Sequence, residues 1–310
     1  MGQANASLTH PRLAALIAQA QSTAALATAV VFPCEASSLQ SAVQAAELGL
    51  ITPVYYGPEQ RILDLAKQLR ITLVGEVIDT GESPVTAAQT AVADARHGYT
   101  RALMKGSLHT DELLSAVVAR DSGLRASSRI THTFVFDIPR YSKLVAITDA
   151  VINIAPDVRT KADAIANACV MLQALGVQQP RVAIAAAVET VNPAIAATLD
   201  AEALVALALE GRFGDAHVEG PMGFDVAISA QAAVTKGLQS NVAGQPDLIV
   251  VPDLNAGNIL YKSLVYMAGA ECAGVVQGAR LPIILTSRAD SAFSRIASCA
   301  LANLLVMRAA

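Results

Sequence analysis

The segment TSRADS, from Thr286 to Ser291, places a hydroxyl, a guanidinium and a carboxylate close together near the end of the chain. Arg288 offers a rigid fork of N–H donors that matches phosphate oxygens and stays charged at any working pH. Ser287 can donate a hydrogen bond to an oxygen or sulfur atom that gains negative charge in a transition state. Asp290 can accept a proton from a nucleophile. The segment therefore predicts a site where an anion binds and charge develops.

This segment lies between two expected elements that would position it. The apolar run from Pro282 to Leu285 predicts a strand, and the sequence from Ala292 onward predicts a helix. Such a loop favours anions, because free N–H groups and the dipole of the following helix point at it. The simpler interpretation is that Ser287 or Asp290 does no more than cap that helix.

A second loop with polar side chains follows a short expected strand. Lys105 is cationic, Gly106 is small, and Ser107 and Thr110 carry hydroxyl groups, a combination that suits an anion. The alternative is an ordinary strand-to-helix turn in which Thr110 caps the next helix.

Polar residues also follow another expected strand and continue into the helix after it. A place at the carboxyl end of a strand favours a binding surface over a core. A glutamine and a glycine precede the last expected strand, where the glycine would let the backbone approach a ligand closely. The candidate ligand-binding residues in these two places are Asp253, Asn255, Asn258, Lys262, Gln277 and Gly278.

Short apolar runs alternate with segments of helical periodicity along the chain, which predicts βαβ units and a mainly parallel sheet. Ser37 with Gln40 has the pattern of a capping box, and Ser83 before Pro84 predicts a helix start. Expected strands cover 29–32, 53–56, 71–78, 102–104, 130–138, 144–148, 181–188, 247–251 and 282–285. Expected helices cover 39–48, 59–69, 84–97, 111–119, 160–175, the stretch between 192 and 209, and 292–307.

The composition argues against several classes of function. The 310-residue chain has a formal charge of −4 and no dense Lys/Arg cluster, so nucleic-acid binding is not expected. The uncharged segment from Leu13 to Cys34 is interrupted by polar residues and Pro33, which predicts a helix and a buried strand instead of a membrane span. The segment before Arg12 has no positive charge, so a secretory signal is not expected and the cytoplasm is the expected location.

The four cysteines are scattered, with no CxxC pair and no histidine at metal-ligand spacing. Free cysteine is among the most frequently buried residue types. We therefore expect four reduced, mostly buried thiols and no metal site.

Three motifs of the C-terminal part occur in an order and spacing that resembles the phosphate acetyl/butyryltransferase family. They are PDLNAGNILYK from Pro252 to Lys262, QGAR from Gln277 to Arg280, and TSRADS. The resemblance implies an enzyme that interconverts acyl-CoA and phosphate with acyl phosphate and coenzyme A, with acetyl-CoA or butyryl-CoA as substrate. It implies catalytic roles for the serine, arginine and aspartate of TSRADS and ligand binding by the other loops. No cofactor is implied, since coenzyme A is a substrate, and a homodimer is expected.

The resemblance also implies a fold similar to that of isocitrate and isopropylmalate dehydrogenases. Such a protein has two lobes, each a three-layer α/β/α sandwich with a mainly parallel sheet, and an active site in the cleft between them. Residues 1–138 with 278–310 would form the N-terminal lobe, and residues 139–277 the second. Acetyl-type members carry a catalytic Asp where this chain has Ser294 and an Arg where it has Tyr266. The C-terminal motif is therefore nearer to the butyryl-type branch.

Two other classes of protein remain open from the sequence. A metal- and NAD-dependent hydroxy-acid dehydrogenase could share this fold, but the sequence has no GxGxxG fingerprint and no clear cluster of metal-binding aspartates. A non-catalytic, acyl-CoA-binding regulatory protein is the second alternative. The chain length and the presence of both Ser287 and Arg288 argue against it.

Overall fold

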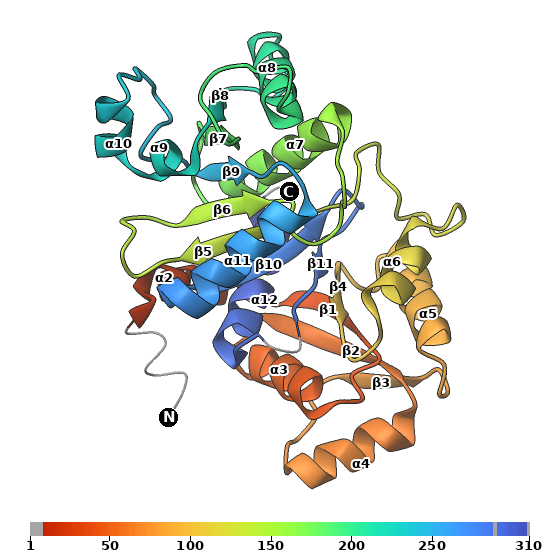
Figure 1. Cartoon of the computed structure of the whole chain (residues 1–310). Helices are drawn as coiled ribbons and strands as arrows, with labels where there is room; N and C mark the ends of the chain where they lie inside the picture. The colour runs from red at the N-terminus through yellow and green to blue at the C-terminus, as the bar shows by residue number, and fades with distance from the viewer. Residues whose placement is uncertain (1–8, 288–289, 309–310) are drawn as a thin grey trace. The chain divides into compact units, whose positions relative to one another are not determined.

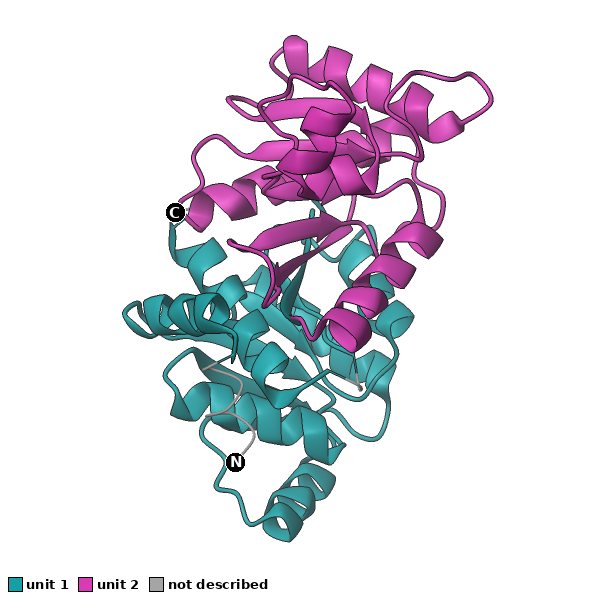
Figure 2. Ribbon diagram, turned by 60° about the vertical axis from the view of Figure 1, so that its left-hand side comes forward, with its two compact units in different colours: residues 1–127, 271–310 teal, residues 128–270 magenta. Residues whose placement is uncertain are grey.

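The computed structural model describes residues 9–287 and 290–308. The chain divides into two compact units, residues 1–127 with 271–310 and residues 128–270 (Figure 2). The chain thus leaves the first unit, builds the whole of the second and then returns. The segment that returns carries the TSRADS motif, so this motif belongs to the first unit.

The first unit is built on a sheet with the strand order β3-β2-β1-β4-β11-β10. Neighbouring strands from β3 to β11 pair in parallel, and β10 pairs antiparallel with β11. Buried aliphatic residues dominate the central strand β1, as expected for a parallel sheet covered on both faces. The strands are β1 (Leu26–Val31), β2 (Ile51–Gly57), β3 (Glu76–Asp79), β4 (Ala102–Lys105), β10 (Glu271–Gln277) and β11 (Ile283–Ile284).

Helices cover both faces of this sheet (Figure 1). On one face α12 packs against α2, α3 and β10, while α5 and α6 pack together on the other face. Most of α12 is buried, which fits its run of small and aliphatic residues. The helices are α2 (Pro11–Gln21), α3 (Ala36–Glu47), α4 (Glu59–Leu69), α5 (Pro84–Arg96), α6 (Thr110–Val118) and α12 (Ala292–Arg308).

The second unit has the strand order β5-β6-β9-β7-β8. The pair β5 and β6 is antiparallel, and the remaining pairs are parallel. The helices α7 and α8 pack together and against the strands, α11 packs on β6, and α9 packs on β7. The strands are β5 (Thr131–Asp137), β6 (Val145–Thr148), β7 (Arg181–Ala185), β8 (His217–Met222) and β9 (Leu248–Val250). The helices are α7 (Val158–Ala174), α8 (Ala196–Leu209), α9 (Phe224–Ile228), α10 (Ala230–Thr235) and α11 (Leu254–Ala268).

The mainly parallel α/β class predicted from the sequence is confirmed. The units divide at 127/128 and 270/271, whereas the sequence placed the divisions at 138/139 and 277/278. Strand pairing explains the difference. β5 pairs with β6 and belongs to the second unit, while β10 pairs with β11 and belongs to the first.

The structure confirms one of the predicted helix starts and contradicts two. Ser83 is the N-cap of α5, and its hydroxyl accepts the N–H of Thr86 at 3.2 Å, as predicted. The predicted capping box of Ser37 is wrong, because α3 already begins at Ala36. Thr110 is likewise not a cap but the first residue of α6. The N-cap there is His109, whose backbone N–H donates to the Glu112 carboxylate at 2.7 Å.

Strands β8 and β10 were not among the strands predicted, and β3 is shorter than the predicted 71–78. All four cysteines are free and buried, as predicted. Within the ranges 9–287 and 290–308, no helix combines the length and the apolar character needed to cross a bilayer.

Candidate active site

The TSRADS loop joins β11 to α12, at the carboxyl end of β11. The backbone N–H of Ser287 donates to Oδ2 of Asp290 at 2.6 Å, and the N–H of Asp290 donates to the carbonyl oxygen of Ser287 at 3.1 Å. These two bonds tie Ser287 to Asp290. Ser287 is exposed and Asp290 is half-buried. Arg288, the predicted phosphate ligand, lies outside the described residues.

The helix cap predicted as an alternative role for this loop is supplied by a different residue. Oγ of Ser291 accepts the N–H of Ser294 at 3.0 Å, which is N-cap geometry at the start of α12. The hydroxyls of Ser291 and Ser294 both donate to Oε2 of Glu271, at 2.7 and 2.5 Å. Glu271, at the start of β10, therefore fastens the loop to the neighbouring strand. Ser294 is buried and also accepts the N–H of Cys272 at 3.2 Å.

A buried arginine holds the same loop from the other side. Arg295, in the first turn of α12, is 7% exposed. Its Nη2 donates to the carbonyl oxygen of Ser287 at 3.2 Å, and its Nη1 donates to the carbonyl oxygen of Ser37 at 3.1 Å. The sequence reasoning missed both Arg295 and Glu271. A charged residue in a helix rich in small and aliphatic residues was the available signal for Arg295.

The β4–α6 loop, with Lys105 at the end of β4 and Thr110 at the start of α6, leaves the strand next to β11. Gly106 lies against the end of β1, and a Cβ atom there would be 2.3 Å from the carbonyl oxygen of Val31. Oγ of Ser107 donates to the carbonyl oxygen of Phe32 at 2.7 Å and accepts the N–H of Cys34 at 2.9 Å. The loop is thus fixed to the segment after β1, and the Ser107 hydroxyl forms part of that attachment.

The Lys105 ammonium folds back over its own loop. Nζ donates to the carbonyl oxygen of Leu108 at 2.8 Å and to that of Gly106 at 3.3 Å. This contact puts a positive charge beside the loop that contains Ser107. Thr110 opens α6 directly after it. Anion binding by these residues stays a prediction, and their placement at one strand end is consistent with it.

Gln277 is the last residue of β10, and Gly278 comes directly after it. Both lie at the end of the strand that is away from the TSRADS loop. The strand runs antiparallel to β11, so its last residue lies at the edge where β11 begins. Gln277 is 7% exposed. Gly278 has a φ of 93°, which most L-residues avoid, so glycine is required there. Within the first unit these two residues are therefore not brought together with Ser287.

The predicted site residues of the second unit surround the start of α11, at the carboxyl end of β9. Asp253 is the N-cap, and its Oδ1 accepts the N–H of Ala256 at 3.0 Å. Gly257 lets the helix approach the loop after β6, because a Cβ atom there would be 2.9 Å from Cα of Ala150. Nδ2 of Asn258 faces the same loop, 3.5 Å from the carbonyl oxygen of Ala150. Asn255 is exposed.

The next turns of α11 combine a buried aromatic ring with an exposed cation. Tyr261 is buried and stacks on Phe134 of β5, with ring centroids 4.4 Å apart. Lys262 is exposed, and its Nζ lies 5.0 Å from the centroid of the Tyr261 ring. The packed tyrosine fixes the helix on the sheet, which leaves Lys262 and Asn255 facing solvent.

The loops after the neighbouring strands of this unit are also held by carboxylates. Oδ1 of Asp149, after β6, accepts the N–H groups of Val151 and Ile152 at 2.9 and 3.0 Å. Lys236 pairs with Glu189 at 2.8 Å and with Asp225 at 3.0 Å. The hydrogen bond from Lys236 holds the pKa of Asp225 below its usual value. The carboxyl ends of the parallel strands thus form an edge rich in polar side chains.

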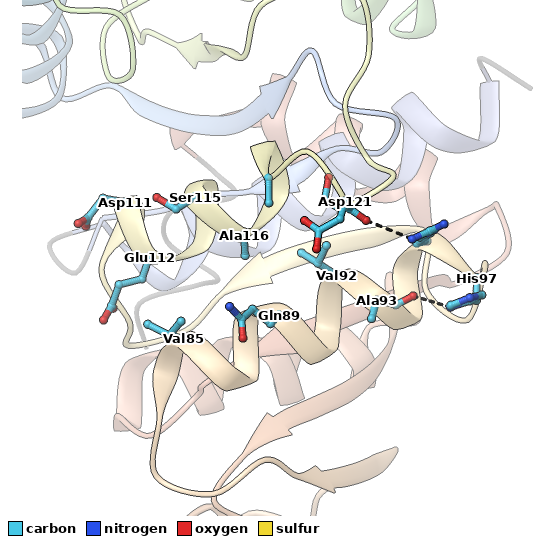
Figure 3. A pocket seen from close by; sticks show the side chains of 13 residues that line it. Val85, Gln89, Val92, Ala93, His97, Asp111, Glu112, Ser115, Ala116 and Asp121 are labelled. Atoms are coloured by element: carbon cyan, nitrogen blue, oxygen red, sulfur yellow. Dashed lines mark hydrogen bonds between the residues drawn. The ribbon is translucent and has the colours of Figure 1, made fainter.

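A surface hollow of about 670 Å³ lies elsewhere in the first unit, between α5 and α6 (Figure 3). Arg96 spans it by donating to the carbonyl oxygen of Asp121 at 3.1 Å, and His97 contacts the carbonyl oxygen of Ala93. The residues that line it include none of the predicted site residues. Geometry therefore gives no reason to place the chemistry there. Over the described ranges, His, Cys, Asp and Glu form no group that could hold a metal ion.

Comparison with known proteins identifies the family. The sequence profile of the family described as phosphate acetyl/butaryl transferase matches residues 81–303. A phosphate acetyltransferase of Rhizobium meliloti is 48% identical over 294 residues, covering 94% of this chain and 93% of the relative. A probable phosphate butyryltransferase of Bacillus subtilis is 44% identical over 220 residues, covering 71% of this chain and 74% of the relative.

Solved structures agree with this assignment. A branched-chain phosphotransacylase of Enterococcus faecalis superposes with a TM-score of 0.79 at 26% identity, covering 91% of this chain and 100% of that chain. A 4-hydroxythreonine-4-phosphate dehydrogenase of Burkholderia phymatum, at 12% identity, has a TM-score of 0.56 and covers 91% and 98%. This second likeness shows the fold alone. Since the family profile spans all three sequence motifs, the chain belongs to the phosphate acetyl/butyryltransferase family.

Proposed function

We propose that this acyltransferase moves an acyl group between coenzyme A and inorganic phosphate, with acetyl-CoA or butyryl-CoA as the thioester. One observation carries the proposal. The TSRADS loop and the Lys105–Thr110 loop leave the neighbouring parallel strands β11 and β4 at the same edge of the sheet. An anion and a reacting carbonyl group could both be bound there.

Each residue of the TSRADS loop has a proposed task. Arg288 binds the phosphate dianion through its fork of N–H donors. Ser287 donates a hydrogen bond to the carbonyl oxygen or the sulfur atom as negative charge grows on it. Its exposed position and the hydrogen bond from its N–H to Asp290 support this role. Asp290 accepts the thiol proton when coenzyme A attacks an acyl phosphate.

The reaction needs no covalent acyl-enzyme. In one direction a phosphate oxygen attacks the thioester carbonyl carbon, a C–O bond forms, the C–S bond breaks, and the thiolate leaves. In the other direction the coenzyme A thiol loses its proton to Asp290, its sulfur attacks the carbonyl carbon of the acyl phosphate, a C–S bond forms, the C–O bond breaks, and phosphate leaves. Both substrates are bound together, so orientation supplies much of the rate enhancement.

Most of the remaining predicted residues would hold coenzyme A and phosphate. We assign this role to Lys105, Gly106, Ser107, Thr110, Asp253, Asn255, Asn258 and Lys262. Lys262 and Asn255 are exposed at the carboxyl edge of the second unit, which supports their assignment. We also propose that the protein works without a metal or redox cofactor, in the cytoplasm, as a homodimer. Light scattering of the purified protein tests the last point.

The proposed function is tested by measuring the rate at which the enzyme forms a thioester from coenzyme A and acetyl, propionyl or butyryl phosphate. We expect turnover with at least one of them, and the ratio of kcat/KM values gives the preferred acyl length. Absence of thioester with every acyl phosphate would contradict the proposal.

A further inference from the structure

We propose that Arg295 is a positioning residue that holds the Ser287 peptide in its reactive orientation. The inference deepens the proposed function and rests on it, because it assumes that Ser287 takes part in acyl transfer. Arg295 itself touches no substrate in this account. It acts through the backbone of the residue that does.

The geometry places one guanidinium between two loops. Nη2 of Arg295 donates to the carbonyl oxygen of Ser287 at 3.2 Å. Nη1 donates to the carbonyl oxygen of Ser37 at 3.1 Å and is 3.5 Å from Oγ of Ser41, in the first turns of α3. The rigid fork of the side chain thus spans the space between the TSRADS loop and α3.

Burial constrains this arrangement. Arg295 is 7% exposed, and its guanidinium donates to backbone carbonyl oxygens of two different segments. Transfer of a charged group out of water is unfavourable unless its hydrogen bonds are replaced. Most of the remaining buried residues of α12 are small or aliphatic and pack well without any charge. The Arg295 guanidinium in the first turn therefore does more than fill the core, because it bonds backbone carbonyl groups of two different segments.

The Ser37 carbonyl oxygen, which accepts one of the Arg295 hydrogen bonds, is itself held in place. The Ser41 hydroxyl donates to the carbonyl oxygen of Ser37 at 2.6 Å, which holds that oxygen within the helix. The segment between β1 and α3 is in turn bonded to Ser107 through Phe32 and Cys34. Arg295 thus ties Ser287 to α3, the helix that directly follows this segment. The TSRADS loop and the β4–α6 loop are therefore both attached to the stretch of chain that runs from β1 into α3.

Positioning matters because Ser287 must meet a developing charge at hydrogen-bond distance. A misplacement of about 1 Å can cost about 100-fold in rate. The Asp290 carboxylate holds the N–H of Ser287, and Arg295 holds its carbonyl oxygen. With both ends of the residue bonded, its Cα–Cβ bond has a fixed direction.

The test compares Arg295→Met with a matched control on the same helix. Asn303 is also buried on α12 and donates to the carbonyl oxygens of Ala24 and Leu50, each at 2.9 Å, far along the helix from the loop. We expect Arg295→Met to lower kcat about 10- to 100-fold with little change in KM for acyl-CoA. Asn303→Leu should change kcat less than about twofold, although both variants lose stability.

A double-mutant cycle with Ser287→Ala separates positioning from a general loss of structure. If Arg295 acts through Ser287, Arg295→Met should have almost no further effect on kcat in the Ser287→Ala background. Arg295→Lys should have a higher kcat than Arg295→Met, since one ammonium can replace only part of the hydrogen bonds that the guanidinium makes to Ser287 and Ser37. The cycle is run with this variant if Arg295→Met does not fold.

The possible outcomes distinguish the inference from the proposed function. Equal kcat losses for Arg295→Met and Asn303→Leu, or independent effects in the cycle, would overturn the positioning role while leaving the acyltransferase intact. An inactive wild-type enzyme would overturn the proposed function and the inference with it.

Discussion

Ser287 and Asp290 are bonded to each other twice, through Ser287 N–H to Asp290 Oδ2 at 2.6 Å and Asp290 N–H to the Ser287 carbonyl oxygen at 3.1 Å. The carboxylate that we propose as a proton acceptor is therefore also the group that holds the Ser287 N–H. Its two roles have different requirements. Holding the N–H needs a hydrogen-bond acceptor, whereas proton transfer needs a carboxylate.

Asp290→Asn should separate these roles. The amide oxygen of Asn can still accept the Ser287 N–H, but it cannot take a proton. We expect kcat for acyl-CoA formation to fall by about 10²–10⁴-fold, the usual contribution of a general base. Steady-state kinetics with acyl phosphate and coenzyme A measure the loss. The melting temperature should stay near that of the wild type.

Ser294→Ala provides the comparison, because the family resemblance of the sequence places the catalytic Asp of acetyl-type members at Ser294. Ser294 is buried and donates to Glu271 at 2.5 Å, so its loss should lower stability more than kcat. A larger kcat loss for Ser294→Ala than for Asp290→Asn would assign proton handling to the Ser294 region instead.

Gly106→Ala should damage the β4–α6 loop. The new methyl group would lie 2.3 Å from the Val31 carbonyl oxygen and 2.5 Å from that of Phe32, so the backbone itself must move. We expect a loss of about 1–3 kcal/mol in the free energy of unfolding. Urea denaturation measures it.

The control for this substitution is Gly57→Ala. There the nearest atom is the end of the flexible Ile62 side chain, at 3.1 Å. The change in unfolding free energy should stay under about 1 kcal/mol. Equal losses at the two glycines would show that the tight contact at Gly106 does not constrain the loop.

Ser83 and Gly106 show what the sequence could predict and what it could not. The N-cap Ser83 was predictable because its partner, Thr86, is nearby in sequence. The sequence also placed TSRADS between a strand and a helix, since apolar periodicity is local. Ser37, one partner of Arg295, lies in α3, and Val31, against which Gly106 packs, lies in β1, both far away in sequence. Only the paired strands bring them together.

The four thiols should be unreactive in the native protein. Burial raises the pKa of Cys34 to about 11, and it raises the pKa of Cys169 and of Cys299 to about 12. Burial also raises the pKa of Cys272. At pH 8 the native thiols are protonated and shielded, so a disulfide reagent should react with them only after denaturation. Fast reaction of a native thiol would contradict the burial of that cysteine.

The raised thiol pKa values also predict how the stability of the protein changes with pH. A thiol with a raised folded-state pKa keeps its proton more tightly in the folded than in the unfolded protein. Its contribution to stability is therefore complete below the ordinary thiol pKa of 9.0 and is lost as pH rises toward 11. Urea denaturation at pH 8 and pH 10.5 should give the lower midpoint at pH 10.5, and the Cys34→Ala variant should show a smaller drop.

Removal of either partner of the ion pair between α7 and α8 should lower the free energy of unfolding, but by different amounts. Lys161 Nζ lies 2.5 Å from Asp200 Oδ2, and their side chains are 6% and 26% exposed. Asp200→Ala leaves a buried ammonium and should cost about 3–5 kcal/mol in unfolding free energy. Lys161→Met should cost less, because Asp200 can reach water. Chemical denaturation of both variants checks the order, and the reverse order would contradict it.

The most direct test of the account is release of free thiol from acyl-CoA by the purified enzyme, with and without inorganic phosphate. We predict release that requires phosphate, saturates with it, and is abolished or demands far more phosphate in Arg288→Ala. Thiol release that is independent of phosphate, or none with acetyl-, propionyl- or butyryl-CoA, would contradict a phosphate acyltransferase.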